Sequence, residues 1–198
     1  MKKIIVATQN QGKVKEIKAV LGDLPVEVYT MGEVGLDMDI EENGTTFEAN
    51  AIIKAEALTE YTDAIVIADD SGLEIDYLNK EPGVYSARYL GKDTPYTEKN
   101  QIILDRLKDV KREERTARFV CAIAMAMKGK ETQTAVETIE GYIGFEAQGT
   151  NGFGYDPIFF VPGLERSTAT LTMEEKNEIS HRAKALRAMK EKIKDMLD

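Results

Sequence analysis

Short apolar runs alternate with segments of helical spacing along the first part of this chain. A first strand is expected at about residues 2–8, around the apolar residues 4–7, and a second short strand is expected near Val26–Tyr29. Between them we expect a helix at about 12–21, with three apolar residues spaced for one buried face: Val14, Ile17 and Leu21. Strands that alternate with amphipathic helices are typical of the α/β class.

A capping box, Thr45-Thr-Phe-Glu48, predicts the start of the next helix. Thr45 can accept a hydrogen bond from the third helical amide while Glu48 reaches back to the cap. The helix is expected to extend to about Tyr61 with one apolar stripe: Phe47, Ala51, Ala55 and Leu58. Asn50 and Lys54 then share another face of this helix, one turn apart.

Further along the chain the spacing predicts one more helix and a β-hairpin. Thr94-Pro95 is expected to open the helix, with Thr94 as N-cap and Pro95 at its first position. The residues that this helix turns inward are Ile103, Leu107 and Val110. Residues 116–127 and 132–145 are expected to form two long antiparallel strands joined at Lys128-Gly-Lys130.

The final helix is expected to bury four residues at helical spacing: Ala183, Leu186, Met189 and Ile193. Because strand–helix units at the front give way to a hairpin, the order predicts an α/β fold around a mixed sheet. No repeat, low-complexity segment or linker interrupts the chain, so residues 1–198 are interpreted as a single domain.

Two adjacent carboxylates, Asp69 and Asp70, follow the apolar strand expected at Ala64–Ala68. Gly72 is expected to make the turn after that strand. The carboxyl ends of strands are where open α/β sheets bind ligands, and neighbouring strand residues point to opposite faces. At most one of the two carboxylates therefore faces a given site. An Asx-turn, in which both carboxylates only satisfy backbone donors, is the alternative for this segment.

The segment Ala7–Lys13 joins the first strand to the first helix and gathers a hydroxyl, a carboxamide and an ammonium at a helix N-terminus. Thr8, Asn10 and Lys13 together with exposed amides suit phosphate oxygens. The segment is not a Walker A loop. The alternative is a plain N-cap by Asn10 with Lys13 exposed to solvent.

A glycine-rich segment, Gly149–Pro157, carries two aromatic residues separated by one glycine. Phe153 and Tyr155 can stack on a flat base, and Asp156 can accept from ring or sugar donors. The alternative is a loop whose two rings cover the edge of the core.

Cations collect before the final helix: Lys176, His181 and Arg182, with the hydroxyl of Ser180 beside them. If the chain bends after Ile179 with Ser180 as N-cap, His181 and Arg182 oppose the helix dipole and require an acceptor nearby. The alternative is one continuous helix from Thr172, capped by Thr172-Met-Glu-Glu175, with His181 exposed.

Composition narrows the chemistry. The chain has one cysteine, Cys121 in an apolar run, and one histidine, so any metal ion would be bound by oxygen ligands. The loop Glu41-Glu42-Asn43-Gly44 could bring a second carboxylate to such a metal ion. A net charge of −9 argues against binding along a nucleic-acid polymer and favours a small anionic substrate.

The chain has no apolar run of about 18 residues, and its start turns polar too early for a signal peptide. We therefore expect a cytoplasmic protein without a membrane contact.

Six motifs in order resemble the inosine triphosphate pyrophosphatase family, also called XTP/dITP diphosphatases, over nearly the whole chain. They are Ala7-Thr8-x-Asn10-x-x-Lys13, Phe47-x-x-Asn50-Ala51-x-x-Lys54-Ala55, Ala68-Asp-Asp-Ser-Gly72, Pro82-Gly-Val-Tyr-Ser-Ala-Arg88, Gly152-Phe-Gly-Tyr-Asp-Pro157 and Lys176-Asn-x-x-Ser-His-Arg182. The resemblance implies a two-lobed single domain around a long curved mixed sheet, a substrate cleft between the lobes, and a homodimer. It implies Mg²⁺-dependent hydrolysis of ITP, dITP or XTP to the monophosphate and pyrophosphate.

The same resemblance implies roles for individual residues. Asp70 resembles the general base, and Glu41 and Asp70 resemble the Mg²⁺ ligands. The triphosphate set is Thr8, Asn10, Lys13 and Lys54. Four further residues are expected to bind the substrate: Gln9, Gln11, Gly12 and Ser71. The base set comprises the stacking pair Phe153 and Tyr155 with Gly154 between them, and the base-reading residues Asp156, Lys176, His181 and Arg182. Gln9 stands where many relatives have glycine, and Tyr155 where some have tryptophan.

Two other functions fit parts of the pattern. One is a pyrophosphatase for modified pyrimidine or methylated nucleotides. The motif Lys176-Asn-x-x-Ser-His-Arg182 argues against this function, because the motif is typical of the purine-specific group. The other is a nucleotide-binding regulator without catalysis, which would keep the cations and dispense with Glu41, Asp69 and Asp70.

Overall fold

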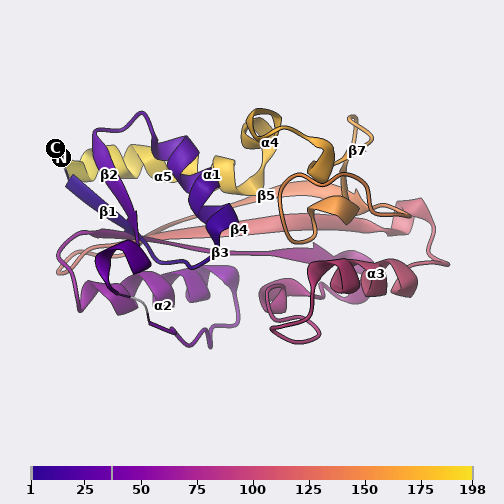
Figure 1. Cartoon of the computed structure of the whole chain (residues 1–198), viewed down its shortest axis with the longest axis horizontal. Helices are drawn as coiled ribbons and strands as arrows, with labels where there is room; N and C mark the ends of the chain where they lie inside the picture. The colour runs from indigo at the N-terminus through magenta and orange to yellow at the C-terminus, as the bar shows by residue number, and fades with distance from the viewer. Residues whose placement is uncertain (1, 37, 198) are drawn as a thin grey trace. The chain divides into compact units, whose positions relative to one another are not determined.

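The computed structural model describes residues 2–36 and 38–197. The chain divides into two compact units. Unit 1 comprises Met1–Asp70, Cys121–Glu137 and His181–Asp198, and unit 2 comprises Ser71–Val120 and Thr138–Ser180. The described strands form a seven-stranded sheet in the order β2-β1-β3-β4-β5-β6-β7 (Figure 1).

Unit 1 is a parallel α/β layer structure. Strand β1 (Lys2–Val6) pairs in parallel with β2 (Val26–Thr30) and with the start of β3 (Ile65–Ile75). Helices α1 (Gln11–Leu21) and α5 (His181–Leu197) pack side by side on one face of these strands, and α2 (Phe47–Thr59) covers the other face (Figure 1). The core under α1 and α5 includes Ile4, Val6, Ile17, Ile65, Ile67, Leu186 and Met189.

Unit 2 is built around the strands that follow. Its remaining elements are α3 (Tyr96–Arg106), the first part of β4 (Thr116–Ala126), the second part of β5 (Gln133–Ile143), β6 (Phe159–Val161), β7 (Arg166–Ser167) and α4 (Met173–Ile179). Strands β5, β6 and β7 pair antiparallel, so with the parallel strands of unit 1 the sheet is mixed, as predicted. Residues 127–132 are too short a connection for a parallel crossover between β4 and β5, which confirms the hairpin. The unit has its own core: Leu73, Ile75, Ile103, Phe119, Ile143, Tyr155 and Phe159.

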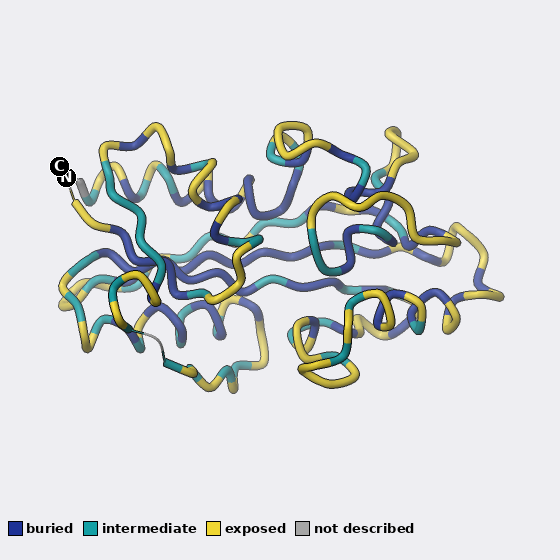
Figure 2. The backbone as a smooth tube through the Cα atoms, in the orientation of Figure 1, coloured by how far each residue is buried: buried dark blue, intermediate teal, exposed yellow. Residues whose placement is uncertain are grey.

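Burial follows the predicted periodicity in the helices. Figure 2 shows each helix with a buried side and an exposed side, while the central strands are buried along most of their length. The predicted inward residues of α2 and α5 are all buried: Phe47, Ala51, Ala55, Leu58, Ala183, Leu186, Met189 and Ile193. No helix among the described residues is long and apolar enough to cross a bilayer.

The turn predicted at Gly72 is wrong. Strand β3 continues through Asp69, Asp70 and Gly72 to Ile75, and Leu73 and Ile75 are fully buried. Polar residues can occupy a central strand here because distant segments supply their partners. The Asx-turn alternative is wrong for the same reason.

Helix starts differ from the predictions by one residue in two places. Thr46, not Thr45, caps α2 by accepting from the amide of Ala49, and Glu48 takes no part in a capping box. Helix α3 begins at Tyr96 with Pro95 as N-cap and no side-chain cap, because Thr94 Oγ1 instead donates to the carbonyl of Leu90.

The bend predicted after Ile179 is confirmed and the continuous helix from Thr172 is wrong, although the capping box of that alternative is present. The capping box of Thr172 and Glu175 opens α4, and the chain breaks at Ser180, whose backbone is extended. Helix α5 then begins at His181, so His181 and Arg182 lie in its first turn.

Candidate functional site

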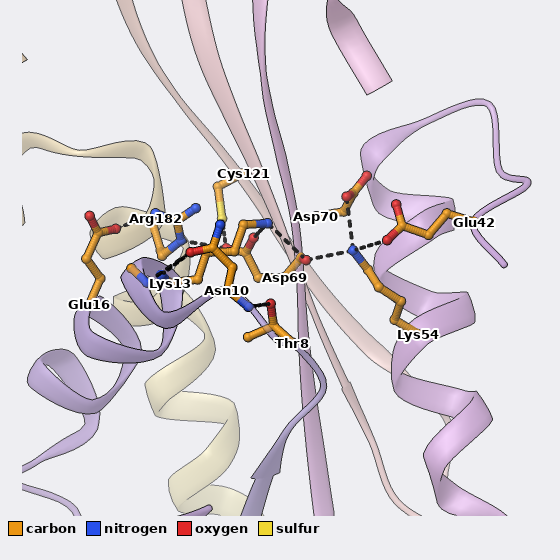
Figure 3. A network of polar contacts seen from close by, with 11 residues as sticks. Thr8, Asn10, Lys13, Glu16, Glu42, Lys54, Asp69, Asp70, Cys121 and Arg182 are labelled. Atoms are coloured by element: carbon orange, nitrogen blue, oxygen red, sulfur yellow. Dashed lines mark hydrogen bonds and ion pairs between the residues drawn. The ribbon is translucent and has the colours of Figure 1, made fainter. Parts of the chain in front are cut away.

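A buried ion cluster in unit 1 surrounds Asp69, whose side chain is fully buried. Arg182 Nε donates to Asp69 Oδ2 at 2.7 Å, Lys13 Nζ pairs with Asp69 Oδ1, and Cys121 Sγ lies 3.2 Å from Oδ2 (Figure 3). Arg182 also pairs with Glu16 on α1. We call these five residues the Asp69 cluster.

Strand geometry explains why these partners meet at Asp69. Alternate residues of a strand point to the same face, so Asp69 shares the face of Ile65 and Ile67, which pack in the core under α1 and α5. Lys13 lies on α1 and Arg182 on α5. Although burial alone would raise the pKa of Asp69, the charges of Arg182 and Lys13 hold that pKa well below its usual range.

Asp70 points to the opposite face, towards α2 (Figure 3). Lys54 Nζ donates to Asp70 Oδ1 at 3.0 Å and to the backbone carbonyl of Asp69 at 2.9 Å. The same ammonium lies 3.1 Å from Glu42 Oε1. Burial raises the pKa of Asp70 despite the opposing effect of Lys54, whereas the pKa of Lys54 is raised because its carboxylate partners outweigh its burial.

One oxygen of Asp70 has no hydrogen-bond partner among the described residues. Asp70 Oδ2 is a buried atom without a partner, although a buried carboxylate oxygen ordinarily accepts a hydrogen bond. The position therefore suits a donor or a cation that arrives with a ligand. No group of three or more His, Cys, Asp or Glu side chains in the described ranges could hold a metal by itself.

The loop carboxylate beside Asp70 and Lys54 is Glu42 rather than Glu41. Glu41, the residue expected to bind the metal, is exposed, whereas Glu42 is half-buried and paired with Lys54. The two neighbours project differently, and the sequence alone gives no sign of which one turns inward. A Mg²⁺ ion that keeps several waters and takes one or two carboxylates plus substrate phosphates fits Glu42 and Asp70.

The N-terminus of α1 is organised by its cap. Asn10 Oδ1 accepts from the amides of Gly12 at 2.9 Å and Lys13 at 3.2 Å, and Thr8 Oγ1 accepts from the amide of Asn10. The N-cap alternative is therefore correct for Asn10, but Lys13 is turned to Asp69 and not to solvent. Gln9 and Gln11 are exposed, and Gly12 is half-buried.

The glycine-rich loop of unit 2 is folded around Asp156. Asp156 Oδ2 accepts from Lys176 Nζ at 2.7 Å and from the amide of Phe153 at 2.8 Å, and Thr168 Oγ1 donates to Oδ1 at 2.8 Å. Lys176 Nζ lies 5.1 Å from the centre of the Phe153 ring. Gly152 is required here, because a Cβ would lie 2.2 Å from Asp156 Oδ2.

Tyr155 is a core residue in this structure. Its side chain is 4% exposed, its hydroxyl donates to the carbonyl of Ser86 at 2.7 Å, and its ring meets Tyr96 edge-on. This is the core-covering alternative for Tyr155, whereas Phe153 and Gly154 are half-buried. A helical residue, Asn100, holds the same loop by donating to the carbonyl of Gly154 at 3.1 Å.

The residues expected to read the base are divided between the two units. Asp156 and Lys176 meet in unit 2, while His181 and Arg182 belong to unit 1. Arg182 is bound to Asp69 and Glu16. His181 is 5% exposed, so the alternative that left it exposed is wrong. Ser71, at the start of unit 2, is half-buried in β3.

Comparison with known proteins decides the family. A model of the Ham1 family matches residues 4–192. This chain belongs to the Ham1 family. It is 49% identical over 189 residues to the dITP/XTP pyrophosphatase of Bacillus licheniformis, with 96% of each chain covered.

Solved Ham1 proteins have the same fold as this Ham1-family chain. The Ham1 protein of Staphylococcus aureus superposes with a TM-score of 0.87 at 42% identity, covering 98% of this chain and 100% of that one. A HAM1 protein from Coxiella burnetii gives 0.88 at 41% identity with the same coverage. The family resemblance and the mixed-sheet α/β fold predicted from the sequence are thus confirmed.

Several residues of this Ham1-family site carry no signal in the sequence. Glu16, Cys121 and Thr168 are ordinary helix, strand and loop residues until the fold brings them to Asp69 and Asp156. Asn50 is different, because it belongs to a quoted motif and shares a helix face with Lys54. That spacing is a usable signal in the sequence for Asn50.

Proposed function

We propose that this protein hydrolyses the non-canonical purine triphosphates ITP, dITP and XTP to the monophosphate and pyrophosphate. The observation that carries the proposal is Asp70, a buried carboxylate with a raised pKa and one oxygen without a partner among the described residues, held beside the ammonium of Lys54. Support also comes from the relatives named dITP/XTP pyrophosphatase, which match nearly the full length of this chain.

The phosphate chain of the substrate is assigned to unit 1. Lys54 and Lys13 supply two ammonium groups, and the capped N-terminus of α1 adds a favourable dipole for anions. Thr8 and Gly12 belong to the same turn. On the motif resemblance we assign Gln9, Asn10 and Gln11 to this phosphate set, and Ser71, the first residue of unit 2, to substrate binding.

Asp70 is the proposed general base. It would take a proton from the attacking water as the water oxygen bonds to phosphorus and the bond from that phosphorus to the pyrophosphate leaving group breaks. A Mg²⁺ ion, when bound with the substrate, supplies neutralisation of developing charge on the phosphate oxygens. Asp70 and Glu42 would hold that ion, while Lys54 keeps Asp70 in place through Oδ1.

The purine base of the substrate is assigned to unit 2. Phe153 is half-buried and offers a ring for stacking, and Lys176 beside it suits the 6-oxo acceptor of hypoxanthine and xanthine. Adenine carries an amino donor at that position, which an ammonium cannot satisfy. We keep Asp156 in this set as the residue that orients Lys176, and we place Gly154 and Tyr155 in the supporting loop.

A panel of nucleoside triphosphates tests the proposal. The purified protein should release pyrophosphate from ITP, dITP and XTP with Mg²⁺ and lose the activity in EDTA. Orthophosphate release with accumulation of the diphosphate would refute it. Preference for modified pyrimidine or methylated nucleotides would favour a different pyrophosphatase, and binding without release would indicate a regulator.

We also propose that the protein is a cytoplasmic homodimer that binds neither nucleic-acid polymers nor membranes. The net charge of −9 supports the absence of polymer binding. Sedimentation equilibrium of the full chain tests the dimer: a mass near 22.1 kDa at all concentrations would show a monomer.

A further inference from the structure

Asn50 lies in α2 one helical turn before Lys54, and its side chain is fully buried. Asn50 Oδ1 accepts a hydrogen bond from the amide of Gly44 at 2.8 Å. Its Nδ2 is buried without a hydrogen-bond partner in the part of the chain that the structure describes. Among the described residues, the one hydrogen-bond partner of this side chain is thus the Gly44 amide.

We infer that Asn50 is a positioning residue that fixes the loop 41–44 and thereby keeps Glu42 beside Lys54 and Asp70. The inference rests on the proposed function, because it concerns the Mg²⁺ carboxylates of that reaction. Residues four apart on a helix are neighbours on its surface. Asn50 therefore holds the backbone of the loop at Gly44. Lys54 holds the carboxylate of the loop at Glu42 (Figure 3).

The chain length between the two attachment points makes the coupling tight. Gly44 and Glu42 are two residues apart, so fixing the Gly44 amide confines the Glu42 backbone to within about 7 Å of it. Without the Asn50 bond, the Lys54 ion pair would have to hold the loop on its own. The Glu42 side chain in this pair is 27% exposed, so solvent competes with Lys54 for its carboxylate.

Gly44 is adapted to this contact. A Cβ at this position would lie 2.6 Å from Asn50 Oδ1, 2.9 Å from Ala49 Cβ and 3.0 Å from the Asn50 amide nitrogen. Two of these neighbours are backbone or the first side-chain carbon of α2 and cannot move aside. The close approach of the loop to the helix thus depends on glycine at 44 and on asparagine at 50.

Stability alone does not account for asparagine at this position. A buried amide whose Nδ2 finds no partner is a cost that an apolar side chain of similar size would avoid. What the asparagine contributes is the hydrogen bond that its Oδ1 accepts from the amide of Gly44. The loop 41–44 carries Glu42, whose carboxylate lies 3.1 Å from the Lys54 ammonium.

The test uses Asn50→Ala and Gly44→Ala in the full chain, with Thr46→Ala as the matched control. Thr46 caps the same end of α2 through the amide of Ala49, so its loss frays the helix without touching the Gly44–Asn50 bond. Three quantities are measured: hydrogen exchange of the amides of residues 41–44, the Mg²⁺ concentration for half-maximal pyrophosphate release, and thermal stabilisation by Mg²⁺ with an α,β-methylene analogue of ITP.

Asn50→Ala and Gly44→Ala should both speed exchange in the loop and raise the Mg²⁺ requirement about tenfold to a hundredfold, the scale for residues that orient metal ligands. The thermal shift with the analogue should need correspondingly more Mg²⁺. Thr46→Ala should leave the Mg²⁺ requirement at the wild-type value. If Asn50→Ala does not fold, Gly44→Ala carries the same test.

An unchanged Mg²⁺ requirement in a folded variant whose loop exchanges faster would overturn the inference. So would an equal rise in Thr46→Ala, because helix fraying would then be the cause. Failure of the proposed function is distinguished by the wild-type protein itself, which would release no pyrophosphate at any Mg²⁺ concentration. That result would overturn the role of Asn50 together with the function.

Discussion

Asp69 and Asp70 are consecutive residues of β3, yet the pKa of one carboxyl group is lowered and that of the other is raised. The strand turns Asp69 towards Arg182 and Lys13, and Asp70 towards Lys54 (Figure 3). Asp69 is fixed as an anion with all its neighbours in place. Asp70 retains an oxygen without a partner among the described residues, and so it is the carboxylate suited to take up a proton.

Replacing Asp70 by Asn should remove turnover while leaving nucleotide binding. The change deletes a general base, which typically costs about 10²–10⁴ in rate, but keeps the cations of Lys13 and Lys54. Single-turnover pyrophosphate release and equilibrium binding of the α,β-methylene analogue measure the two effects separately. A variant that turns over normally would show that Asp70 is not the base.

The titration of Asp70 in the Mg²⁺-free protein should report the same group. Because burial raises the pKa of Asp70, its carboxylate takes up a proton as pH falls through a value above the usual aspartate pKa of about 3.9. The measurement is the NMR titration of the Asp70 carboxyl carbon without Mg²⁺, because a bound cation would lower the pKa of its ligand. A midpoint at or below the ordinary value would contradict this interpretation of Asp70.

Asp69→Asn should act on stability. Removing the carboxylate leaves Arg182 and Lys13 without their shared partner, and breaking a buried ion pair in this way costs about 3–5 kcal/mol. Urea unfolding at pH 7 measures the loss.

The pH dependence of that loss follows from the lowered pKa of Asp69. Its stabilisation is present above the unfolded-state pKa of about 3.9 and is lost as pH falls towards the lower folded-state value. The difference between wild type and Asp69→Asn should therefore be constant above about pH 5 and shrink below about pH 4. A gap that widens on acidification would reverse the assigned direction.

Arg182→Ala should reduce the turnover of ITP and ATP by similar factors. In this structure the guanidinium of Arg182 binds Asp69 and Glu16. Its loss therefore disturbs the Asp69 cluster whether the nucleotide carries hypoxanthine or adenine. Steady-state kinetics with both nucleotides, at a temperature where the variant is folded, provide the measurement. A loss confined to ITP would restore the base-reading role that the sequence suggested for Arg182.

Tyr155→Phe should lower stability and leave the KM for ITP unchanged. The hydroxyl makes a buried hydrogen bond to Ser86, worth about 0.5–1.5 kcal/mol. Unfolding by urea and the KM for ITP are compared with those of wild type. A raised KM without a change in stability would place the hydroxyl at the substrate.

The sequence predicted the fold wherever spacing determines burial. The stripe of α5, the capping box of Thr172 and the hairpin at 128–130 are local patterns, and the structure has all three. The predicted turn at Gly72 failed because the polar run before it is stabilised by Lys54, Lys13 and Arg182, which lie far away in sequence. No local rule reports such partners.

In the candidate site, too, the features set by local sequence were predictable and those set by tertiary contacts were not. The N-cap by Asn10 and the shared helix face of Asn50 and Lys54 follow from residue type and spacing. The choice between Glu41 and Glu42 depends on how a non-helical loop is attached, and the burial of Tyr155 depends on Ser86 and Tyr96. These are tertiary contacts, which composition and periodicity do not encode.

The Asp69 cluster also sets an order of events during protein synthesis. Its members come from α1, β3, β4 and α5, so the segment that supplies Arg182 is translated after all the others. A nascent chain that has emerged only as far as α4 holds Lys13, Glu16, Asp69 and Cys121 but lacks the guanidinium that joins two of the carboxylates. Completion of this buried cluster must therefore wait until the final helix has left the ribosome.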